Sequence, residues 1–458
     1  MRLVQLTPGA GPMLCGNCFR DNALVAALRQ LGHDALLAPL YLPLTLDEPD
    51  QSAGTPVFFG GINVYLDQES SLFRGAPGWL RRVLDSPRLL RWAAGRAART
   101  RPQDLGELTL SMLQGEAGRQ ARELDELCAW LKTQPRPDAI FLSNALLMGL
   151  VRRLRGAVGA PVISMLQGED TFLDALPEPH RAACWQTLAQ RAAEADLCVA
   201  PSRYFADLMR QRLGLPTERV RVVYNGIRLE GYDPGPEAKA FQEGHGRDAR
   251  ATESGLGILP KPDGPEARAT EPPVLGFFAR MCREKGLDLL VDAYLLLRQR
   301  GRAGRLKLRL GGSCGPADAP LVESLRGRLE SAGLAGDVEF CPNLDRAQKC
   351  AFYRSLSLLS VPARYGEAFG LYVIEALAAG VPVVQPRLGA FPELIEATGG
   401  GVLCQPDDAL SLAEALEGLL LDPARARALG EHGRQTVREK FSAERMARGM
   451  VAVVGERG

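Results

Sequence analysis

Short apolar runs alternate with longer stretches of mixed apolar and polar residues along almost the whole 458-residue chain. Apolar runs of roughly four to eight residues, bounded by glycine, proline or polar residues, are typical of buried parallel strands. In the first half we predict strands at 2–7, 36–41, 57–64, 138–143, 161–166, 196–200 and 220–224. In the second half we predict them at 273–279, 306–311, 337–341, 356–361, 382–386 and 401–404. Helical stretches separate these strands, which predicts an α/β protein with parallel sheets.

The chain changes composition between its two halves. Residues 234–273 carry many Pro, Gly, Glu and Ala and almost no aromatic residues, which is typical of a linker or a mobile loop. We therefore predict one α/β domain over 1–230, a linker over 231–272 and a second α/β domain over 273–440. A helical insertion is expected at about 72–135 in the first domain.

Overall composition narrows the class of protein. The length fits two or three domains, and 46% hydrophobic with 24% charged residues is typical of a soluble globular chain. A net charge of +1 gives no general attraction to nucleic acid. No apolar run approaches the roughly 20 residues that span a bilayer. The start runs directly into a strand without a secretory signal, so we expect a cytoplasmic protein.

Cys15 and Cys18 form the single CxxC pair among ten cysteines. A zinc site would need two more ligands, and neither a second CxxC nor an HxxxH follows. The place between a strand and a helix fits a thioredoxin-like pair, but thioredoxin folds are far smaller than this chain. We expect most of the cysteines to act as small hydrophobic residues.

The segment Glu367-Ala-Phe-Gly-Leu-Tyr-Val-Ile-Glu375 places one glutamate on a loop and one inside a short apolar helix. A helix start offers free backbone N–H groups to a phosphate, and a carboxylate one turn further in can accept hydrogen bonds from ribose hydroxyls. Glutamates near a helix start are also common because they favour the helix dipole. Both interpretations are open from this segment alone.

Arg280 and Lys285 follow the first strand of the second half. Ligands of open α/β sheets bind at the carboxyl ends of the strands, where a guanidinium and an ammonium group can neutralise a diphosphate and stabilise it as a leaving group. The alternative is a solvated charged turn, since Arg283 and Glu284 lie in the same loop.

Taken in order, these pieces resemble a known family. Arg280 to Gly286 after a strand, a strand ending at Gly311-Gly312, a strand ending at Val361-Pro362 and the Glu367–Glu375 segment resemble the C-terminal domain of retaining, GT-B-fold glycosyltransferases of family 4. Ala195 to Ser202 and Arg221 to Ile227 resemble the segment of the first domain that leads to the interdomain crossing. The resemblance implies two Rossmann-like domains facing a cleft, with a C-terminal helix at 441–458 packing back on the first domain.

The resemblance also implies roles for individual residues. Arg280 and Lys285 would bind the donor diphosphate and assist its departure, and Glu367 would contact the donor sugar. Further donor-binding residues would be Gly9, Gly11, Leu344, Phe369, Gly370, Leu371 and Glu375, with Glu375 on the ribose. No cofactor and no metal are implied, and no Asp-x-Asp pattern is present. The Gly9-to-Gly11 loop does not satisfy a dinucleotide-binding fingerprint, because no third glycine opens the following helix at the right spacing.

One position departs from the family pattern. Many relatives carry a histidine at the end of the strand over 161–166, where this chain has Gln167. Gln167 can donate a hydrogen bond to a sugar hydroxyl but cannot carry a proton. Glu169 and Asp170 are candidates to orient the acceptor, or else belong to a helix cap or a solvated loop. Related retaining enzymes are thought to use the leaving phosphate as the base, so the missing histidine need not abolish turnover.

We therefore expect transfer of a hexosyl unit from a UDP-, GDP- or ADP-linked sugar to a hydroxyl of a glycan, lipid-linked or small-molecule acceptor. The arginine-rich segment 79–101 fits either an amphipathic helix at the inner face of a membrane or a solvated helical insertion. Two other functions are open: a GT-B sugar phosphorylase or nucleotide-sugar epimerase, and a non-catalytic nucleotide-sugar-binding protein. A Rossmann dehydrogenase is disfavoured by the failed fingerprint.

Overall fold

The structure of the chain is a computed structural model that describes all residues except 10–15, 45, 47, 60–101, 233–271 and 457–458. The chain divides into two compact units. Unit 1 comprises Met1–Arg228, Tyr365–Leu371 and Glu439–Gly458. Unit 2 comprises Leu229–Arg364 and Tyr372–Arg438. Each unit is built around one parallel sheet, as the alternation of apolar and mixed stretches predicts.

Unit 1 contains a six-stranded parallel sheet in the order β2-β1-β3-β4-β5-β6. Its strands are β1 (Arg2–Thr7), β2 (Asp34–Pro39), β3 (Ala139–Leu142), β4 (Val162–Met165), β5 (Leu197–Ala200) and β6 (Val220–Val222). Its helices are α1 (Gly16–Gln30), α5 (Pro102–Gln114), α6 (Ala121–Thr133), α7 (Val151–Val158), α8 (Glu169–Asp174), α9 (His180–Glu194), α10 (Arg203–Leu213) and α19 (Ala443–Gly455). Short 3-10 turns add η3 (Gly115–Ala117), η4 (Ala145–Leu150) and η5 (Thr217–Arg219).

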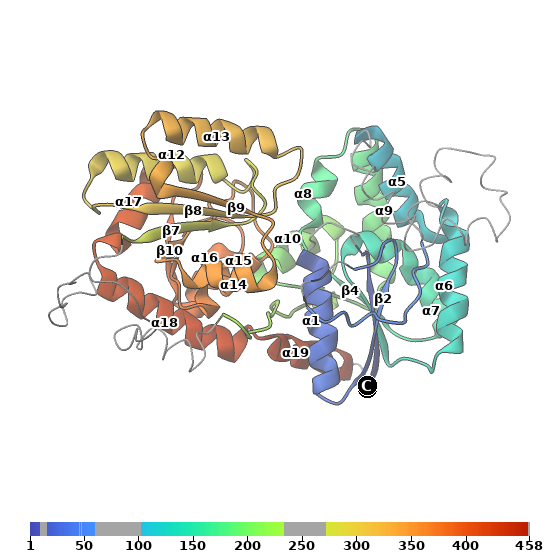
Figure 1. The fold of residues 1–458 in the computed structure, drawn as a ribbon. Helices are drawn as coiled ribbons and strands as arrows, with labels where there is room; N and C mark the ends of the chain where they lie inside the picture. Colours follow the sequence, from blue (N-terminus) through green and yellow to red (C-terminus); the bar gives the residue numbers. More distant parts are fainter. Residues whose placement is uncertain (10–15, 45, 47, 60–101, 233–271, 457–458) are drawn as a thin grey trace, which may run out of the picture. The chain divides into compact units, whose positions relative to one another are not determined.

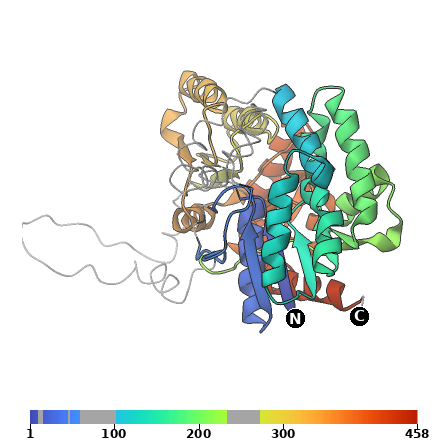
Figure 2. The same ribbon diagram turned by 90° about the vertical axis from the view of Figure 1, so that its right-hand side faces the viewer.

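Side chains alternate along these strands between two apolar cores, one on each face of the sheet. Leu3 faces a cluster formed with α1 and α19, whereas Val4 faces a cluster formed with α5 to α10. The last helix thus packs with the first one, through Ala443, Met446, Ala447, Met450 and Val453. Figure 2 shows the red end of the chain beside the blue strands and helix of its beginning.

Unit 2 repeats the plan with the order β12-β11-β10-β7-β8-β9, again all parallel. Its strands are β7 (Val274–Phe278), β8 (Lys307–Gly312), β9 (Val338–Pro342), β10 (Leu358–Leu359), β11 (Val383–Pro386) and β12 (Gly401–Cys404). Its helices are α12 (Leu287–Arg300), α13 (Ala319–Ser331), α14 (Arg346–Arg354), α15 (Leu371–Ala378), which begins in unit 1, α16 (Phe391–Thr398), α17 (Ala409–Leu420) and α18 (Pro423–Lys440), with the 3-10 turn η7 (Ala335–Asp337). Figure 1 shows α12 and α13 on one side of the sheet and α14 to α16 on the other.

The predicted strands agree with the structure except in one place. Residues 57–59 of the strand predicted over 57–64 have irregular backbone, and 60–64 lie outside the described residues. Residues 57–59 form no strand: Phe59 is buried in the unit 1 core, and its N–H donates to Leu40 O in the turn after β2. The first helix of the chain, α1, begins at Gly16.

The predicted helical insertion is described only from 102 onward, as α5 and α6, so the basic segment 79–101 lies outside the described residues. The predicted linker lies almost wholly outside them as well. No helix in the part of the chain that the structure describes is long and apolar enough to cross a membrane.

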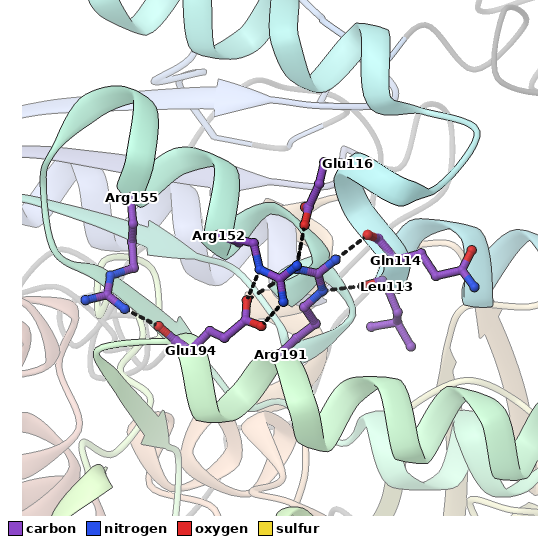
Figure 3. Close-up of polar contacts among 7 residues, drawn as sticks. All are labelled: Leu113, Gln114, Glu116, Arg152, Arg155, Arg191 and Glu194. Carbon is purple, nitrogen blue, oxygen red and sulfur yellow. Dashed lines mark hydrogen bonds and ion pairs between the residues drawn. The ribbon is translucent and has the colours of Figure 1, made fainter.

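Arg191 of α9 holds the end of α5 in place in unit 1 (Figure 3). Its guanidinium donates to the carbonyl oxygens of Leu113 and Gln114, which are orphan acceptors at the C-terminus of α5. It also contacts the carboxylates of Glu116, at 3.0 Å, and Glu194, at 3.2 Å. Burial opposes ionisation of Glu116, but its hydrogen bonds, including that from Arg191, lower its pKa overall.

We expect Arg191→Met to destabilise unit 1 by about 3 kcal/mol, because it leaves the carbonyl groups of Leu113 and Gln114 without their donor and takes one of two guanidinium partners from Glu116 and Glu194. Arg191 is only 5% exposed. Arg152→Met is the matched control, because Arg152 pairs with the same two carboxylates from an exposed position on α7. Chemical unfolding curves of the two variants would show a clear shift for Arg191→Met alone. Equal shifts would contradict the importance of the buried contacts.

Candidate functional site

The carboxyl edge of the unit 2 sheet gathers the polar residues that the sequence singles out. β10, β7, β8 and β9 are consecutive neighbours in this parallel sheet, so the loops that follow them emerge along one edge. These loops carry Arg280 and Lys285 after β7, Asn343 and Leu344 after β9, and Arg364 after β10.

Arg280 is oriented by a forked contact with Asp318, the residue before α13. Its Nε lies 3.0 Å from Oδ2 and its Nη2 lies 2.9 Å from Oδ1. The carboxylate is buried, whereas 57% of the arginine side chain remains exposed. The hydrogen bond from Arg280 to Asp318 raises the pKa of Arg280, so its positive charge is fixed at this edge.

Lys285 comes from the same loop. Its Nζ lies 5.5 Å from the ring centroid of Tyr372 on α15, a cation–π distance. The next residue, Gly286, has a φ of 74°, and a Cβ there would lie 2.0 Å from Pro362 O. Only glycine therefore lets the Lys285 loop approach the segment after β10.

Arg364 ties the loops after β7 and β10 together. It donates to Arg283 O at 3.0 Å and contacts Asp288 Oδ1 at 2.6 Å and Asp407 Oδ1 at 2.7 Å. Its backbone N–H donates to Glu284 O. These contacts make the loop that carries Lys285 a rigid part of unit 2 and not a loose charged turn.

Glu375 lies in α15, with 13% of its side chain exposed. Tyr232 Oη donates to Oε1 at 2.9 Å, Lys349 Nζ donates to Oε1 at 3.0 Å, and Tyr353 Oη donates to Oε2 at 2.9 Å. The carboxylate is therefore held in one orientation.

The loop before α15 groups with unit 1. Glu367 accepts a hydrogen bond of 2.6 Å from Tyr365 Oη, and Phe369 packs against Tyr224 and Phe441. Ser202, the N-cap of α10, donates to Ala368 O at 2.7 Å. Gly370 and Leu371 lie at the start of α15, as expected.

Leu344 lies between β9 and α14. The residue before it, Asn343, has a φ of 56°, its N–H donates to Gly312 O, and its side-chain oxygen accepts from Cys314 N at 3.2 Å. This segment is thus held at the ends of β8 and β9, and its exposed side can offer backbone groups to a ligand.

Gly9 lies two residues after the end of β1 in unit 1. Its φ is 73°, and a Cβ would lie 1.7 Å from Leu42 O, so no other residue fits without a backbone shift. Gly11 lies outside the described residues, as does Cys15. Cys18 is buried on α1. Among the described residues, no group of three or more His, Cys, Asp and Glu side chains could hold a metal ion.

Gln167 and Glu169 lie at the end of β4 and are both engaged within unit 1. Gln167 Oε1 accepts from Asn225 Nδ2 at 3.1 Å. Glu169 accepts from Ala145 N at 2.6 Å and from Gln167 N at 2.8 Å, so its carboxylate joins the loops after β3 and β4. Burial raises the pKa of Glu169 despite these backbone donors.

Asp170 differs from its neighbour because its Oδ1 is buried without a hydrogen-bond partner. Burial raises the pKa of this carboxyl group, with backbone N–H groups acting in the opposite direction. A buried acceptor without a donor destabilises the fold. A hydrogen bond from a ligand hydroxyl or a water molecule to Asp170 would therefore be favourable.

A cluster of buried polar side chains on α1 and at the end of β1 was not predicted. Arg20 and Asp21 form a buried ion pair, and Arg20 Nη2 also donates to Ser143 O at 2.8 Å. Arg20 Nη1, Asp21 Oδ2 and the hydroxyl of Thr7 have no hydrogen-bond partner. These atoms lie near the carboxyl ends of β1 and β3, where polar groups of a ligand or water can form the missing hydrogen bonds.

Sequence reasoning missed the three donors to Glu375 and the Asp318 partner of Arg280. Lys349 and Tyr353 are four residues apart on α14, a spacing that places them on one helix face. That spacing indicates that the two side chains can contact the same group, but it does not identify the group. Tyr232 lies 143 residues from Glu375, and nothing in its local pattern points there.

Two protein-family models match parts of the chain. Glycosyl transferases group 1 matches residues 263–436, and Glycosyltransferase Family 4 matches residues 107–230. A similar curated protein is D-inositol 3-phosphate glycosyltransferase of Segniliparus rotundus, with 29% identity over 277 residues, which are 60% of this chain and 55% of the relative. The chain thus spans about half the length of the curated relatives that it matches.

Solved structures share the whole fold at low sequence identity. Sucrose-phosphate synthase from Thermosynechococcus elongatus has a TM-score of 0.69 and 19% identity, covering 100% of this chain and 99% of that one. Anabaena HepE in complex with UDP-glucose has a TM-score of 0.63 and 16% identity, covering 100% of both chains. These likenesses confirm the predicted GT-B architecture of two Rossmann-like domains. The two glycosyltransferase family models each match one part of the chain.

Proposed function

We propose that this protein transfers a hexosyl unit from a nucleotide diphosphate sugar to an acceptor hydroxyl, with retention at the anomeric carbon and without a metal ion. The observation that carries the proposal is the single sheet edge of unit 2, where Arg280, Lys285 and the helix of Glu375 emerge together. The relative of known structure that binds UDP-glucose supports the same class of donor.

In this proposal the bond between the anomeric carbon and the β-phosphate oxygen breaks, and its electrons leave with the diphosphate. Arg280, Lys285 and the backbone N–H groups at the start of α15 stabilise the negative charge that develops there. The two side chains supply the positive charge that a metal ion supplies elsewhere. The acceptor hydroxyl adds to the anomeric carbon on the same face, and its proton passes to the departing phosphate oxygen.

Glu375 would accept a hydrogen bond from the ribose, and Glu367 would contact the donor sugar. Leu344 and its neighbours would border the base through their backbone. Gly9 and Gly11 would allow close backbone approach to the donor. Asp170 is the favoured acceptor-side carboxylate, because Glu169 already accepts from two backbone donors whereas Asp170 has a buried oxygen without one.

A thermal-stabilisation screen of UDP-, GDP- and ADP-sugars tests the donor class. A donor present at 100 times its Kd should stabilise the protein by about 2.7 kcal/mol. Absence of stabilisation by every nucleotide-sugar would overturn the proposal. With the stabilising donor, product analysis across an acceptor panel should show a new glycoside, and its anomeric configuration by NMR should match that of the donor.

The same assay distinguishes the other candidate functions. A sugar phosphate formed only when inorganic phosphate is supplied would indicate a phosphorylase, and an altered donor formed without acceptor would indicate an epimerase. Donor binding without product across the acceptor panel would indicate a binding protein.

A further inference from the structure

Hydrogen-bond donors from unit 2 occupy most of the acceptor positions on the Glu375 carboxylate. A carboxylate has about four acceptor positions, two on each oxygen. Tyr232 and Lys349 take both positions on Oε1, and Tyr353 takes one on Oε2. One position remains, on Oε2, for a ligand hydroxyl.

Two different parts of unit 2 supply these donors. Lys349 and Tyr353 come from successive turns of α14. Tyr232 comes from the short segment 229–232, which has no regular structure. The donors therefore come from two separate segments of unit 2.

The segment 229–232 is itself tied to α14. Arg346 Nη2 donates to Glu230 O at 3.0 Å, and Arg354 Nη1 donates to Gly231 O at 2.5 Å. The Tyr232 ring is 1% exposed and lies 5.9 Å from the Tyr353 ring and 5.8 Å from the Arg346 guanidinium. Tyr232 is therefore fixed by packing on α14, and its hydroxyl is presented to Glu375 at a set position.

The tyrosines remain donors over the working range of pH. Burial, followed by the nearby charge of Glu375, raises the pKa values of Tyr232 and Tyr353 well above that of a free tyrosine. Neither hydroxyl ionises under ordinary conditions, so each keeps its proton for the carboxylate.

We propose that Tyr232, Lys349 and Tyr353 are positioning residues that hold the Glu375 carboxylate so that Oε2 accepts a hydrogen bond from one ribose hydroxyl of the nucleotide. This inference rests on the proposed function, in which Glu375 binds the ribose. A carboxylate with fixed orientation loses little freedom when it meets the hydroxyl, so the three donors increase the affinity for ribose without touching it.

The test compares ribose and deoxyribose ligands on Tyr232→Phe, which removes only one hydroxyl. Calorimetry would measure the Kd of UDP, 2′-deoxy-UDP and 3′-deoxy-UDP, with the GDP and ADP series run in parallel. On the wild-type protein we expect one deoxy analogue of the binding series to bind roughly tenfold to hundredfold more weakly, the effect of losing a hydrogen bond to a charged group. Tyr232→Phe should bind the ribonucleotide about tenfold more weakly, whereas its Kd for that deoxy analogue should equal the wild-type value. The ratio of the two Kd values should therefore be smaller in the variant than in the wild-type protein.

Tyr294→Phe is the matched control. Tyr294 is also a buried tyrosine of unit 2, but its hydroxyl donates to Leu306 O and not to Glu375. This variant should keep the wild-type preference for ribose. Tyr353→Phe and Lys349→Met provide the same measurement if Tyr232→Phe does not fold.

Each outcome bears on one proposal. If no nucleoside diphosphate binds the wild-type protein, or if it binds ribose and deoxyribose forms equally, the assignment of Glu375 to ribose fails. If the wild-type protein discriminates and the variants discriminate equally well, the three residues do not position Glu375. Equal weakening of both ligand forms would also overturn positioning, because it would indicate general damage to the site.

Discussion

Glu375→Ala should lower kcat/KM for the nucleotide-sugar by about 1,000-fold. The substitution removes the acceptor that we propose for the ribose. It also removes the acceptor of the buried Tyr232 and Tyr353 hydroxyls and one acceptor of the Lys349 ammonium group. Each unsatisfied buried donor costs free energy of its own, so the loss should exceed that of one hydrogen bond.

Steady-state kinetics with the identified donor would measure this loss. Glu375→Gln keeps the shape of the side chain but not its charge, and it should fall between the wild-type protein and Glu375→Ala. Glu323→Ala, which removes an exposed carboxylate from α13, should have no effect. Wild-type kcat/KM in Glu375→Ala would refute the donor site as a whole.

Lys285→Ala should reduce kcat by about 100-fold to 1,000-fold, with a smaller change in donor affinity. We propose that the ammonium group faces the leaving diphosphate, whose charge grows as the glycosidic bond breaks. Its stabilising effect is therefore larger in the transition state than in the bound donor complex. Lys285→Arg keeps the charge and should recover part of the rate, although its fork geometry differs from that of a point charge.

Arg283→Ala is the control for Lys285→Ala. Arg283 lies two residues away on the same loop, carries the same charge and has an exposed side chain. Its carbonyl contact with Arg364 survives the substitution because it involves only the backbone. Equal losses in both variants would mean that the loop acts through its overall charge and not through Lys285.

The sheets could be predicted from the sequence because parallel strands are buried on both faces and therefore appear as short continuous apolar runs. β12 was predicted with its exact limits, at 401–404. The run at 57–59 is apolar in the same way, but Phe59 packs into the core from a loop. Pattern alone does not distinguish a buried strand from a buried loop residue.

The candidate donor residues could be predicted for a related reason. Arg280 and Lys285 follow the end of β7, so the sheet itself determines at which edge they lie. The support around them could not be predicted in this way. Tyr232 reaches Glu375 only through folding of a segment that has no regular structure, and the Arg280–Asp318 fork joins residues 38 positions apart.

The packing of α19 with α1 has a consequence for synthesis of the protein on the ribosome. Residues that belong to the beginning of the chain emerge first, yet one core of unit 1 includes Ala443, Met446, Ala447, Met450 and Val453. At about 5 to 20 residues per second, the early strands wait tens of seconds for these partners. The half of the protein that is translated first is thus the half completed last, and truncation before residue 443 would leave an apolar face of α1 exposed for chaperones to bind.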